Sequence, residues 1–419
     1  MIADVLVKNA SELVTARGAG GGPKTKKGMN ELGILRNGAL AIKGEEIVAV
    51  GETDKVLATI ERARTVIDAT GRIVLPGFVD CHTHLVFGGS REDEFVQKIE
   101  GRFYLEIMES NGGILSTVDK TRQALASPGT LTKRAEAFLG KMLAFGTTTA
   151  EIKSGYGLST ESELGLLKII AGLKETQPVD IVPSFLGAHA FPKEYRERKG
   201  DYIQLILDML ERVKTEGQAE YCDVFVEVGA FSPSEARTIL EQAKKQGLKL
   251  KLHAGEFHDI GGAELGAQLG ATSVDHLDYI SDRGMELMAE KKTIGVLLPG
   301  VPFHLMTNRY APARKLIEAG VPIALATDFN PGSCPTFSMQ MIIALACRQM
   351  KMTPAEAINA ATINAAYALD RGDKVGSIEV GKRADIIVLD IPRHQQLPYW
   401  FGGNLVVMAI KNGAITYPP

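Results

Sequence analysis

The sequence predicts an α/β protein: a (β/α)8 TIM barrel with a small β-sandwich domain formed by both chain ends. Two patterns carry this prediction. Short apolar runs alternate with amphipathic segments through the middle of the chain, whereas β-type alternation marks the two ends. The length of 419 residues also suits one large domain and a smaller one. The predicted division gives residues 1–73 plus 374–419 to the sandwich and residues 74–373 to the barrel.

Both chain ends read as short strands joined by turns. Near the start stand "DVLVKNA" and "GALAIKGEEIVAVG", and near the end "GSIEVGKRADIIVLD" and "LVVMAIKNGAIT". Alternating apolar residues bounded by glycine and aspartate turn residues favour β structure. The Gly- and Lys-rich stretch at 18–29 is expected to be a disordered loop without an assigned role.

The central segment repeats a strand-then-helix pattern eight times. One of its helical patterns is "SPSEARTILEQAKKQG" at 232–247. Eight such repeats over about 300 residues fit a TIM barrel. A doubly wound open sheet is the alternative, although no GxGxxG follows the first strand. The candidate strands lie at 72–84, 147–152, 179–187, 222–228, 248–255, 272–277, 293–300 and 321–328.

Composition and charge exclude several classes of protein. The formal net charge is −3 and the pI near 6.3, so the basic footprint of a nucleic-acid-binding protein is missing. The first residues do not resemble a signal peptide, and no apolar run reaches membrane-spanning length. A cytoplasmic enzyme is therefore expected. The cysteines are too dispersed for a disulfide framework, and a free buried thiol is favoured over a metal ligand for Cys81.

Polar residues follow nearly every predicted strand, and these are the candidate functional residues. His82 and His84 stand two apart, so on a strand both imidazoles leave the same face. In a barrel the carboxyl ends of the strands converge on the face that carries the active site. Histidines and an aspartate gathered there are suitable ligands for Zn²⁺ or Fe²⁺. The other candidates are Glu151, Lys153, Tyr156, His189, Glu227, His253, Glu256, Asp275, His276, Asp328 and Asn330.

Each candidate also has an ordinary structural explanation. A single histidine at a strand end is more often a hydrogen-bonded structural residue, and Asp328 in "ATDFNPGS" could simply begin a turn. Lys153 could be a carbamylated bridge between two metals. Because Gly155 and Gly157 follow it, we interpret Lys153 as a loop residue and favour one metal. The combination of candidates indicates a metal site more strongly than any one of them.

The stretches that carry these residues resemble a known family. "PGFVDCHTHLVFGGSREDEF", "FLGAHAFP", "LKLHAGEF" and "SVDHLD" are similar to motifs of the amidohydrolase superfamily. "EIKSGYGL" and "TDFNPGS" are similar, within it, to the imidazolonepropionase family. The resemblance implies hydrolysis of 4-imidazolone-5-propanoate to N-formimidoyl-L-glutamate in histidine degradation. It also implies a homodimer with one Zn²⁺ or Fe ion per subunit.

The same resemblance implies a role for each motif residue. It makes His82, His84, His253 and Asp328 the metal ligands, and Glu256, His276 and Asp328 the catalytic residues. The sequence departs from the family's usual residues at Cys81, Gly255, Ser333 and His304. The substrate-binding residues that it implies are Arg91, Tyr156, His189, Glu256, Asn330, Gly332 and Ser333.

The chemistry of a cyclic amide explains this choice of residues. A bound metal lowers the pKa of its water to about 7 and can polarise a carbonyl. Arg91 offers a bidentate fork for the propanoate, its alternative being a surface ion pair with the adjacent "EDE". Another mononuclear amidohydrolase or deaminase acting on a cyclic amide or amidine is the nearest alternative function. A non-catalytic scaffold of the same fold would be expected to lose these ligands.

Overall fold

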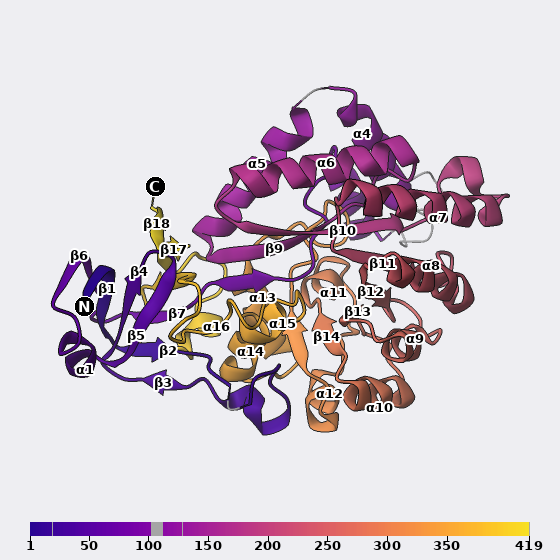
Figure 1. Cartoon of the computed structure of the whole chain (residues 1–419). Coiled ribbons are helices and arrows are strands. Elements are labelled where there is room, and N and C mark those ends of the chain that lie inside the picture. Colours follow the sequence, from indigo (N-terminus) through magenta and orange to yellow (C-terminus); the bar gives the residue numbers. More distant parts are fainter. Residues whose placement is uncertain (19, 102–111, 128, 419) are drawn as a thin grey trace.

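The computed structural model describes residues 1–18, 20–101, 112–127 and 129–418. A parallel eight-stranded barrel lies beside a two-sheet unit that contains both termini (Figure 1). The predicted TIM barrel with a β-sandwich from both chain ends is confirmed. No helix within the described ranges is long and apolar enough to cross a membrane.

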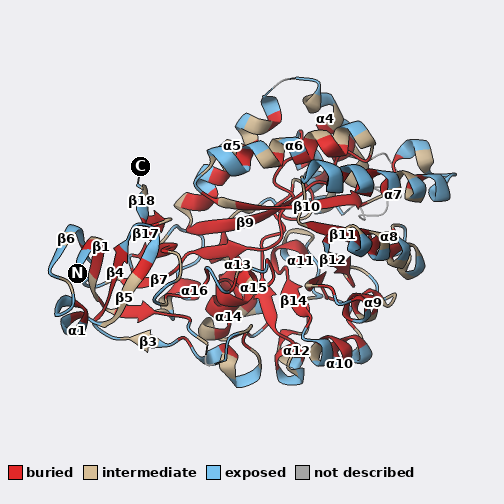
Figure 2. Cartoon of the chain, viewed as in Figure 1, coloured by how far each residue is buried: buried red, intermediate tan, exposed pale blue. Residues whose placement is uncertain are grey.

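The barrel strands pair in chain order, each parallel to the next. Apolar side chains fill the barrel wall and its contacts with the helices, and the strands are almost wholly buried (Figure 2). All eight predicted strand positions contain a barrel strand. These are β8 (Phe78–Asp80), β9 (Thr147–Lys153), β10 (Asp180–Ala188), β11 (Tyr221–Val226), β12 (Lys249–Ala254), β13 (Ser273–His276), β14 (Ile294–Leu297) and β15 (Ile323–Leu325).

The first predicted strand is in fact two strands. The part at 73–76 is β7 (Ile73–Pro76), which pairs antiparallel with β16 (Ile386–Leu389) of the two-sheet unit, and β8 begins only at Phe78. Gly77 separates them where the chain passes close to β9: a Cβ at Gly77 would lie 2.3 Å from Thr148 side-chain atoms. The apolar run is continuous in sequence because both strands are buried, so its composition does not reveal the break.

Two backbone hydrogen bonds close the barrel between its first and last strands. Asp328 N donates to the carbonyl of His82, and His84 N donates to that of Phe329, each at 3.0 Å. These bonds lie just beyond the ends of β8 and β15 and flank the parallel bridge between Thr83 and Phe329. The segments that carry three of the predicted ligands therefore also complete the barrel.

Helices cover the outside of the barrel (Figure 1). The helix predicted at 232–247 is α8, which starts with a capping box between Ser232 and Glu235 and buries Ile239 and Leu240. The helices of this layer are α2 (Glu92–Ile99), α4 (Ile114–Leu125), α5 (Thr130–Ala144), α6 (Thr160–Thr176), α7 (Lys199–Glu216), α8 (Pro233–Lys245), α9 (Gly262–Leu269), α10 (Asp282–Lys291), α11 (Gly300–His304), α12 (Ala313–Ala319), α13 (Met339–Gln349), α14 (Pro354–Ala360), α15 (Ile363–Tyr367) and α16 (Gln396–Tyr399), with η2 (Lys193–Tyr195) before α7.

The two-sheet unit joins the chain ends. Its apolar core combines side chains of both sheets, for example Val5 and Leu40 with Val74, Val388 and Ile410. The boundaries at 73/74 and 373/374 stay a prediction. One sheet has the order β5 (Glu46–Glu52), β4 (Gly38–Lys43), β1 (Ile2–Ala10), β6 (Arg62–Asp68), with α1 (Thr53–Leu57) after β5; the other has the order β18 (Ala414–Tyr417), β17 (Val406–Lys411), β16, β7, β2 (Glu12–Val14), β3 (Ile34–Leu35).

The Gly- and Lys-rich stretch is packed against the barrel domain from Lys24 onward, so the expectation of a disordered loop was wrong for that part; residue 19 lies outside the described residues. Lys24 is buried, and its Nζ donates to Asn359 Oδ1 at 3.0 Å. Lys24 N donates to Asn364 Oδ1 at 2.7 Å, while Asn364 Nδ2 donates to the Lys24 carbonyl at 2.9 Å. The segment then enters η1 (Lys26–Asn30), which packs on α14. Its partners lie about 340 residues away, so local composition could not reveal them.

Candidate metal centre and active site

The four predicted ligands meet at the carboxyl ends of the barrel strands. His82 and His84 follow β8, His253 lies in β12, and Asp328 follows β15. His84 Nε2 lies 3.3 Å from both His82 Nε2 and His253 Nε2. Asp328 Oδ1 lies 3.4 Å from His82 Nε2 and 3.3 Å from His84 Nε2. His82, His84 and Asp328 therefore form a mutual cluster, and His253 adjoins it through His84.

Two buried carboxylates orient the imidazoles of this cluster. Asp275 Oδ2 lies 2.6 Å from His82 Nδ1, and Asp223 Oδ1 lies 3.1 Å from His253 Nδ1. A carboxylate accepts the Nδ1–H proton, so the Nε2 lone pair of the neutral ring faces the cluster. Sequence reasoning had noted Asp275 only as a strand-end residue and had missed Asp223.

The donor set fits a divalent metal ion. Lone pairs of neutral imidazoles repel one another at 3.3 Å unless a cation lies among them, and the buried Asp328 Oδ1 has no hydrogen-bond partner among the described residues. Ligands about 2.0–2.1 Å from a tetrahedral Zn²⁺ lie roughly 3.3–3.4 Å apart, which matches the four separations. His82 with His84 and Asp328, and His82 with His253 and His276, each bring their donor atoms within 4.8 Å.

The electrostatics of the cluster also suit a cation. Burial lowers the pKa of His84 to about 4, so its ring is neutral at physiological pH. Burial acts to raise the pKa of Asp328, but the adjacent rings of His82 and His84 outweigh it and hold that pKa well below its usual value. Burial and Lys153 act to lower the pKa of His82, but Asp275 and Asp328 raise it to about 8. A proton held there would be displaced by a metal.

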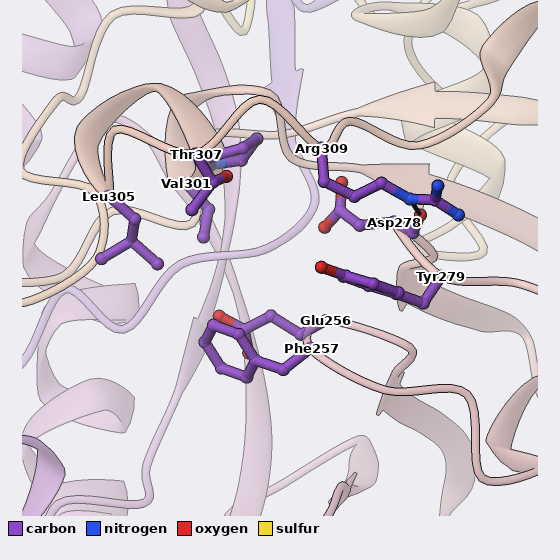
Figure 3. Close-up of a pocket in the computed structure, with 9 residues that line it drawn as sticks. Glu256, Phe257, Asp278, Tyr279, Val301, Leu305, Thr307 and Arg309 are labelled. Carbon is purple, nitrogen blue, oxygen red and sulfur yellow. Dashed lines mark hydrogen bonds between the residues drawn. The ribbon is translucent and has the colours of Figure 1, made fainter. Parts of the chain in front are cut away.

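Glu256 and His276 lie beside the cluster. His276 Nε2 is 3.8 Å from Glu256 Oε2, and neither ring nitrogen of His276 has a hydrogen-bond partner in the described chain. Burial, and then the charges of Asp328, Asp278 and Glu227, raise the pKa of Glu256 well above its usual value. Glu256 and Phe257 also line a side cavity of about 280 Å³ with Asp278 (Figure 3). Glu256 is therefore a carboxyl group that stays protonated at a higher pH than usual.

A pocket of about 440 Å³ opens over the cluster. Phe225, Phe257 and Ile114 give it apolar walls, which suit the methylene groups of a small organic acid. Cys81 lies outside its lining and is a free buried thiol, as expected. The predicted site residues that line the pocket are His84, Arg91, Tyr156, His189, His253, Glu256, His276, Asp328, Asn330 and Ser333.

Arg91 forms the ion pair with the adjacent "EDE", but this pair is buried and does not lie at the surface, while the pairing of Arg91 with a propanoate stays a prediction. Its side chain is only 4% exposed, and its Nε donates to Glu94 Oε2 at 2.9 Å, within the adjacent "EDE". It nevertheless faces the pocket. The ion pair is therefore buried at the wall of the pocket, where it orients the guanidinium.

A tight turn carries Asn330, Gly332 and Ser333. Asn330 Oδ1 accepts from the backbone N–H groups of Gly332 and Ser333, both at 2.8 Å, and Asn330 Nδ2 donates to the Asp328 carbonyl at 2.7 Å. Ser333 Oγ donates to Asp328 Oδ2 at 3.3 Å. The turn therefore connects the pocket wall to the predicted ligand Asp328.

His189 and Tyr156 also line the pocket. The ring of His189 stacks on His84 at 4.9 Å between centroids, and His189 Nδ1 donates to the Gly155 carbonyl at 2.9 Å. Glu163 of α6 holds the loop of Tyr156, because Glu163 Oε1 accepts from Gly157 N at 2.7 Å and from Leu158 N at 2.9 Å. Glu163 was not among the predicted residues. Its position at the start of an amphipathic helix gave no signal of this role.

The interpretation of Lys153 as a loop residue was wrong. Lys153 is the last residue of β9, is fully buried, and donates to Asp223 Oδ2 at 2.7 Å and to Glu151 Oε1 at 2.9 Å. Lys251 of β12 donates to Glu151 Oε2 at 2.7 Å. In the sequence, charged residues stand two apart within apolar runs, as in "EIK" and "KLKLH". This spacing places them on one face of a strand and could have predicted the buried charges of Glu151, Lys153 and Lys251.

Comparisons with known proteins agree with this arrangement. The Amidohydrolase family matches residues 73–416. Imidazolonepropionase of Alkaliphilus metalliredigens (strain QYMF) is 47% identical over 417 residues, covering 99% of this chain and 98% of that protein. Imidazolonepropionase of Geobacillus sp. (strain WCH70) is 48% identical over 416 residues, covering 98% and 97%.

Solved structures share the fold at lower identity. An adenosine deaminase from Xanthomonas campestris with bound zinc has a TM-score of 0.70 at 18% identity, covering 99% of this chain and 93% of that one. Guanine deaminase of E. coli has a TM-score of 0.72 at 17% identity, covering 98% and 99%. These structures support the architecture and leave the substrate to be argued from the site.

Proposed function

Because the chain belongs to the amidohydrolase family and, within it, to the imidazolonepropionase family, we propose that it hydrolyses 4-imidazolone-5-propanoate to N-formimidoyl-L-glutamate in histidine degradation. The observation that carries the proposal is the cluster of ligand atoms at the strand ends, in a pocket that also contains Arg91. His84 Nε2 lies 3.3 Å from the Nε2 atoms of His82 and His253, and Asp328 Oδ1 lies 3.3–3.4 Å from His84 and His82. The reaction adds water to the ring carbonyl and breaks the C–N bond to the adjacent ring nitrogen.

We propose that these four residues hold one Zn²⁺ or Fe ion per subunit. A divalent ion supplies an activated water and polarises the scissile carbonyl. Asp328 and Glu256 are placed to hold the proton that the water loses, and His276 adjoins Glu256. That proton passes to the ring nitrogen as the C–N bond breaks, so the oxygen ends in the new carboxylate and the reaction needs no other reactant. General acid–base groups contribute about 10²–10⁴-fold to such a step.

The remaining residues bind and orient the substrate. Arg91 pairs with the propanoate carboxylate, because a guanidinium offers two parallel donors to a carboxylate. Tyr156, His189, Asn330 and Ser333 supply polar contacts to the ring, and Gly332 leaves room for Arg91. His189 donates its Nδ1–H to Gly155, so its Nε2 is left as an acceptor for a ring N–H.

The decisive experiment follows the ultraviolet absorbance of freshly generated imidazolonepropanoate with metal-loaded and chelated protein. We expect metal-dependent loss above the spontaneous rate, with N-formimidoyl-L-glutamate formed in equal amount. A protein that binds metal but leaves this substrate intact would instead be another mononuclear amidohydrolase or deaminase, and other cyclic amides and amidines would then be assayed.

Three further expectations accompany the proposal: a homodimer, no nucleic-acid partner, and a cytoplasmic location. The pI near 6.3 supports the second of these, because a nucleic-acid partner would normally require a basic surface. Light scattering after gel filtration, a nucleic-acid retention assay and cell fractionation would test the three separately.

A further inference from the structure

Beneath the predicted ligands lies a layer of buried charges that the proposed mechanism does not use. It contains three carboxylates and two lysines, and each of these side chains is fully buried. Ser273 Oγ donates to Asp275 Oδ1 at 2.6 Å, and Ser184 Oγ donates to Glu151. The layer consists of Glu151, Lys153, Asp223, Lys251 and Asp275.

Lys153 occupies a special position in this layer. Its Nζ is 2.7 Å from Asp223 Oδ2 and 3.7 Å from Asp275 Oδ2. Asp223 Oδ1 also contacts His253 Nδ1, and Asp275 Oδ2 also contacts His82 Nδ1. One ammonium group therefore lies between the two carboxylates that orient two of the proposed ligands.

We infer that Lys153 is a positioning residue for the metal site, holding Asp223 and Asp275 in the places from which they orient His253 and His82. This inference rests on the proposed function. Partners of metal-bound histidines fix the ring's tautomer and direction, and their loss typically costs 10–100-fold in metal affinity or activity. Here one cation supports two such partners on different strands, β11 and β13.

Electrostatics gives the physical reason. Asp223, Asp275 and Glu151 would repel one another without a compensating cation, and burial removes the water that would otherwise screen them. Burial acts to lower the pKa of Lys153, but Asp223, Glu151 and Asp275 outweigh it and raise that pKa, so the ammonium form is retained. With Asp328 added to the three carboxylates of the layer, the site has four carboxylates and two lysines. If the histidines are neutral, these groups carry a net charge of −2, which one divalent ion neutralises.

Lys251 provides a matched control. It is equally buried and donates to the same carboxylate, Glu151, at 2.7 Å, and to the Cys81 carbonyl at 3.0 Å. In the described chain, neither Asp223 nor Asp275 is among its hydrogen-bond or ion-pair partners. Lys153→Met and Lys251→Met each remove one buried positive charge, and the charge of Lys251 also acts on Asp275. Only Lys153→Met removes the 2.7 Å hydrogen bond to Asp223 and the 3.7 Å contact with Asp275.

The test is a Zn²⁺ titration against a chromophoric chelator, with the visible spectrum of Co²⁺-loaded protein recorded for each variant. We expect Lys153→Met to weaken Zn²⁺ binding about 10- to 100-fold, to change the Co²⁺ spectrum, and to lower kcat with little change in KM. Lys251→Met should retain most of the Zn²⁺ affinity and leave the Co²⁺ spectrum unchanged. Equal affinities and spectra for the two variants would overturn the inference.

Other outcomes remain decisive. If the methionine variants do not fold, Lys153→Gln and Lys251→Gln, which keep a hydrogen-bond donor, are compared in the same way. A wild-type protein that binds neither Zn²⁺ nor Co²⁺ would refute the proposed metal site itself. A wild-type protein that binds metal, with Lys153 variants that match the Lys251 variants, would refute only the role of Lys153.

Discussion

The guanidinium of Arg91 lies against the backbone of Gly332. A Cβ built on Gly332 would lie 1.8 Å from Arg91 Nη1 and 2.3 Å from Arg91 Cζ. The backbone of Gly332 needs no left-handed conformation, so the requirement at this position is space. Arg91 and the turn after Asp328 are thus packed as one wall of the pocket, where the proposed substrate carboxylate would bind.

Removing Arg91 should mainly weaken substrate binding. A hydrogen-bonded charged pair contributes about 1.5–3 kcal/mol, so Arg91→Ala should raise KM roughly 10- to 150-fold with a smaller change in kcat. Gly332→Ala should displace the guanidinium and raise KM in the same direction, whereas Gly403→Ala, where a Cβ meets no atom within 4 Å, should not. Steady-state kinetics measures this. An unaltered KM in Arg91→Ala would remove the arginine from the substrate site.

Loss of one proposed ligand should remove both metal and activity. His253→Ala deletes a donor atom that lies 3.3 Å from His84 Nε2, so bound metal, measured by elemental analysis, and turnover should fall together. His394→Ala is the control, because His394 is also paired with a carboxylate, Glu12, but lies far from the cluster in sequence and fold. Chelation should abolish turnover reversibly. Full activity in metal-free wild-type protein would contradict the proposal.

Replacing the acid beside the cluster should slow the chemical step. Glu256→Gln keeps the shape of the side chain but cannot transfer a proton, so kcat should fall about 10²- to 10⁴-fold with KM and metal content nearly unchanged. Asp278→Asn changes another buried carboxyl of the side cavity and should have a much smaller effect. Comparable kcat losses in the two variants would argue against a specific proton-transfer role for Glu256.

The loop that carries Tyr156 should show pH-dependent stability through Glu163. Burial raises the pKa of Glu163, although the hydrogen bonds that it accepts from the Ser154 side chain and from backbone N–H groups act to lower it. The folded state therefore keeps this proton to a higher pH than the unfolded chain. Its stabilising contribution is complete below the usual pKa and is lost as pH rises through the folded pKa.

Glu163→Gln removes that titration. The variant loses hydrogen-bond strength at the loop, which should lower its free energy of unfolding by about 1–3 kcal/mol relative to the wild type. This difference should become smaller from pH 5 to pH 8, because the wild type loses the contribution of the Glu163 proton as pH rises. Thermal unfolding at several pH values measures the difference. Glu161→Gln, an exposed neighbour in the first turn of α6, should track the wild type throughout. A constant deficit for Glu163→Gln would exclude this titration.

The Gly- and Lys-rich segment should contribute to stability through Lys24. Lys24→Ala leaves the buried acceptor Asn359 Oδ1 and the partly buried Glu31 carbonyl without this donor, which should cost about 1–3 kcal/mol in the free energy of unfolding. Lys27→Ala, on an exposed residue of the same segment, should cost much less. Denaturant titration compares the two. Equal costs would mean that the buried contacts of Lys24 contribute nothing specific.

The sequence alone determined the order of the elements and the cluster of proposed ligands. Strand periodicity located all eight barrel strands, because buried parallel strands are continuous apolar runs and their polar ends interrupt them. The His82 and His84 pair could be recognised as a candidate ligand pair because side chains two apart on a strand share a face. Strand-end position also made His253 and Asp328 candidates, and the family motifs then implied that both are ligands.

Only the tertiary structure decided which distant charges meet. It divided the run at 72–84 between two sheets, placed Lys153 between Asp223 and Asp275, and buried Lys24 against Asn359 and Asn364. Each of these outcomes depends on a partner far away in the chain, and a buried lysine is stable only where such a partner exists. The local sequence determines which face of a strand or helix a residue occupies, whereas the closure of the barrel determines which distant residues that face contacts.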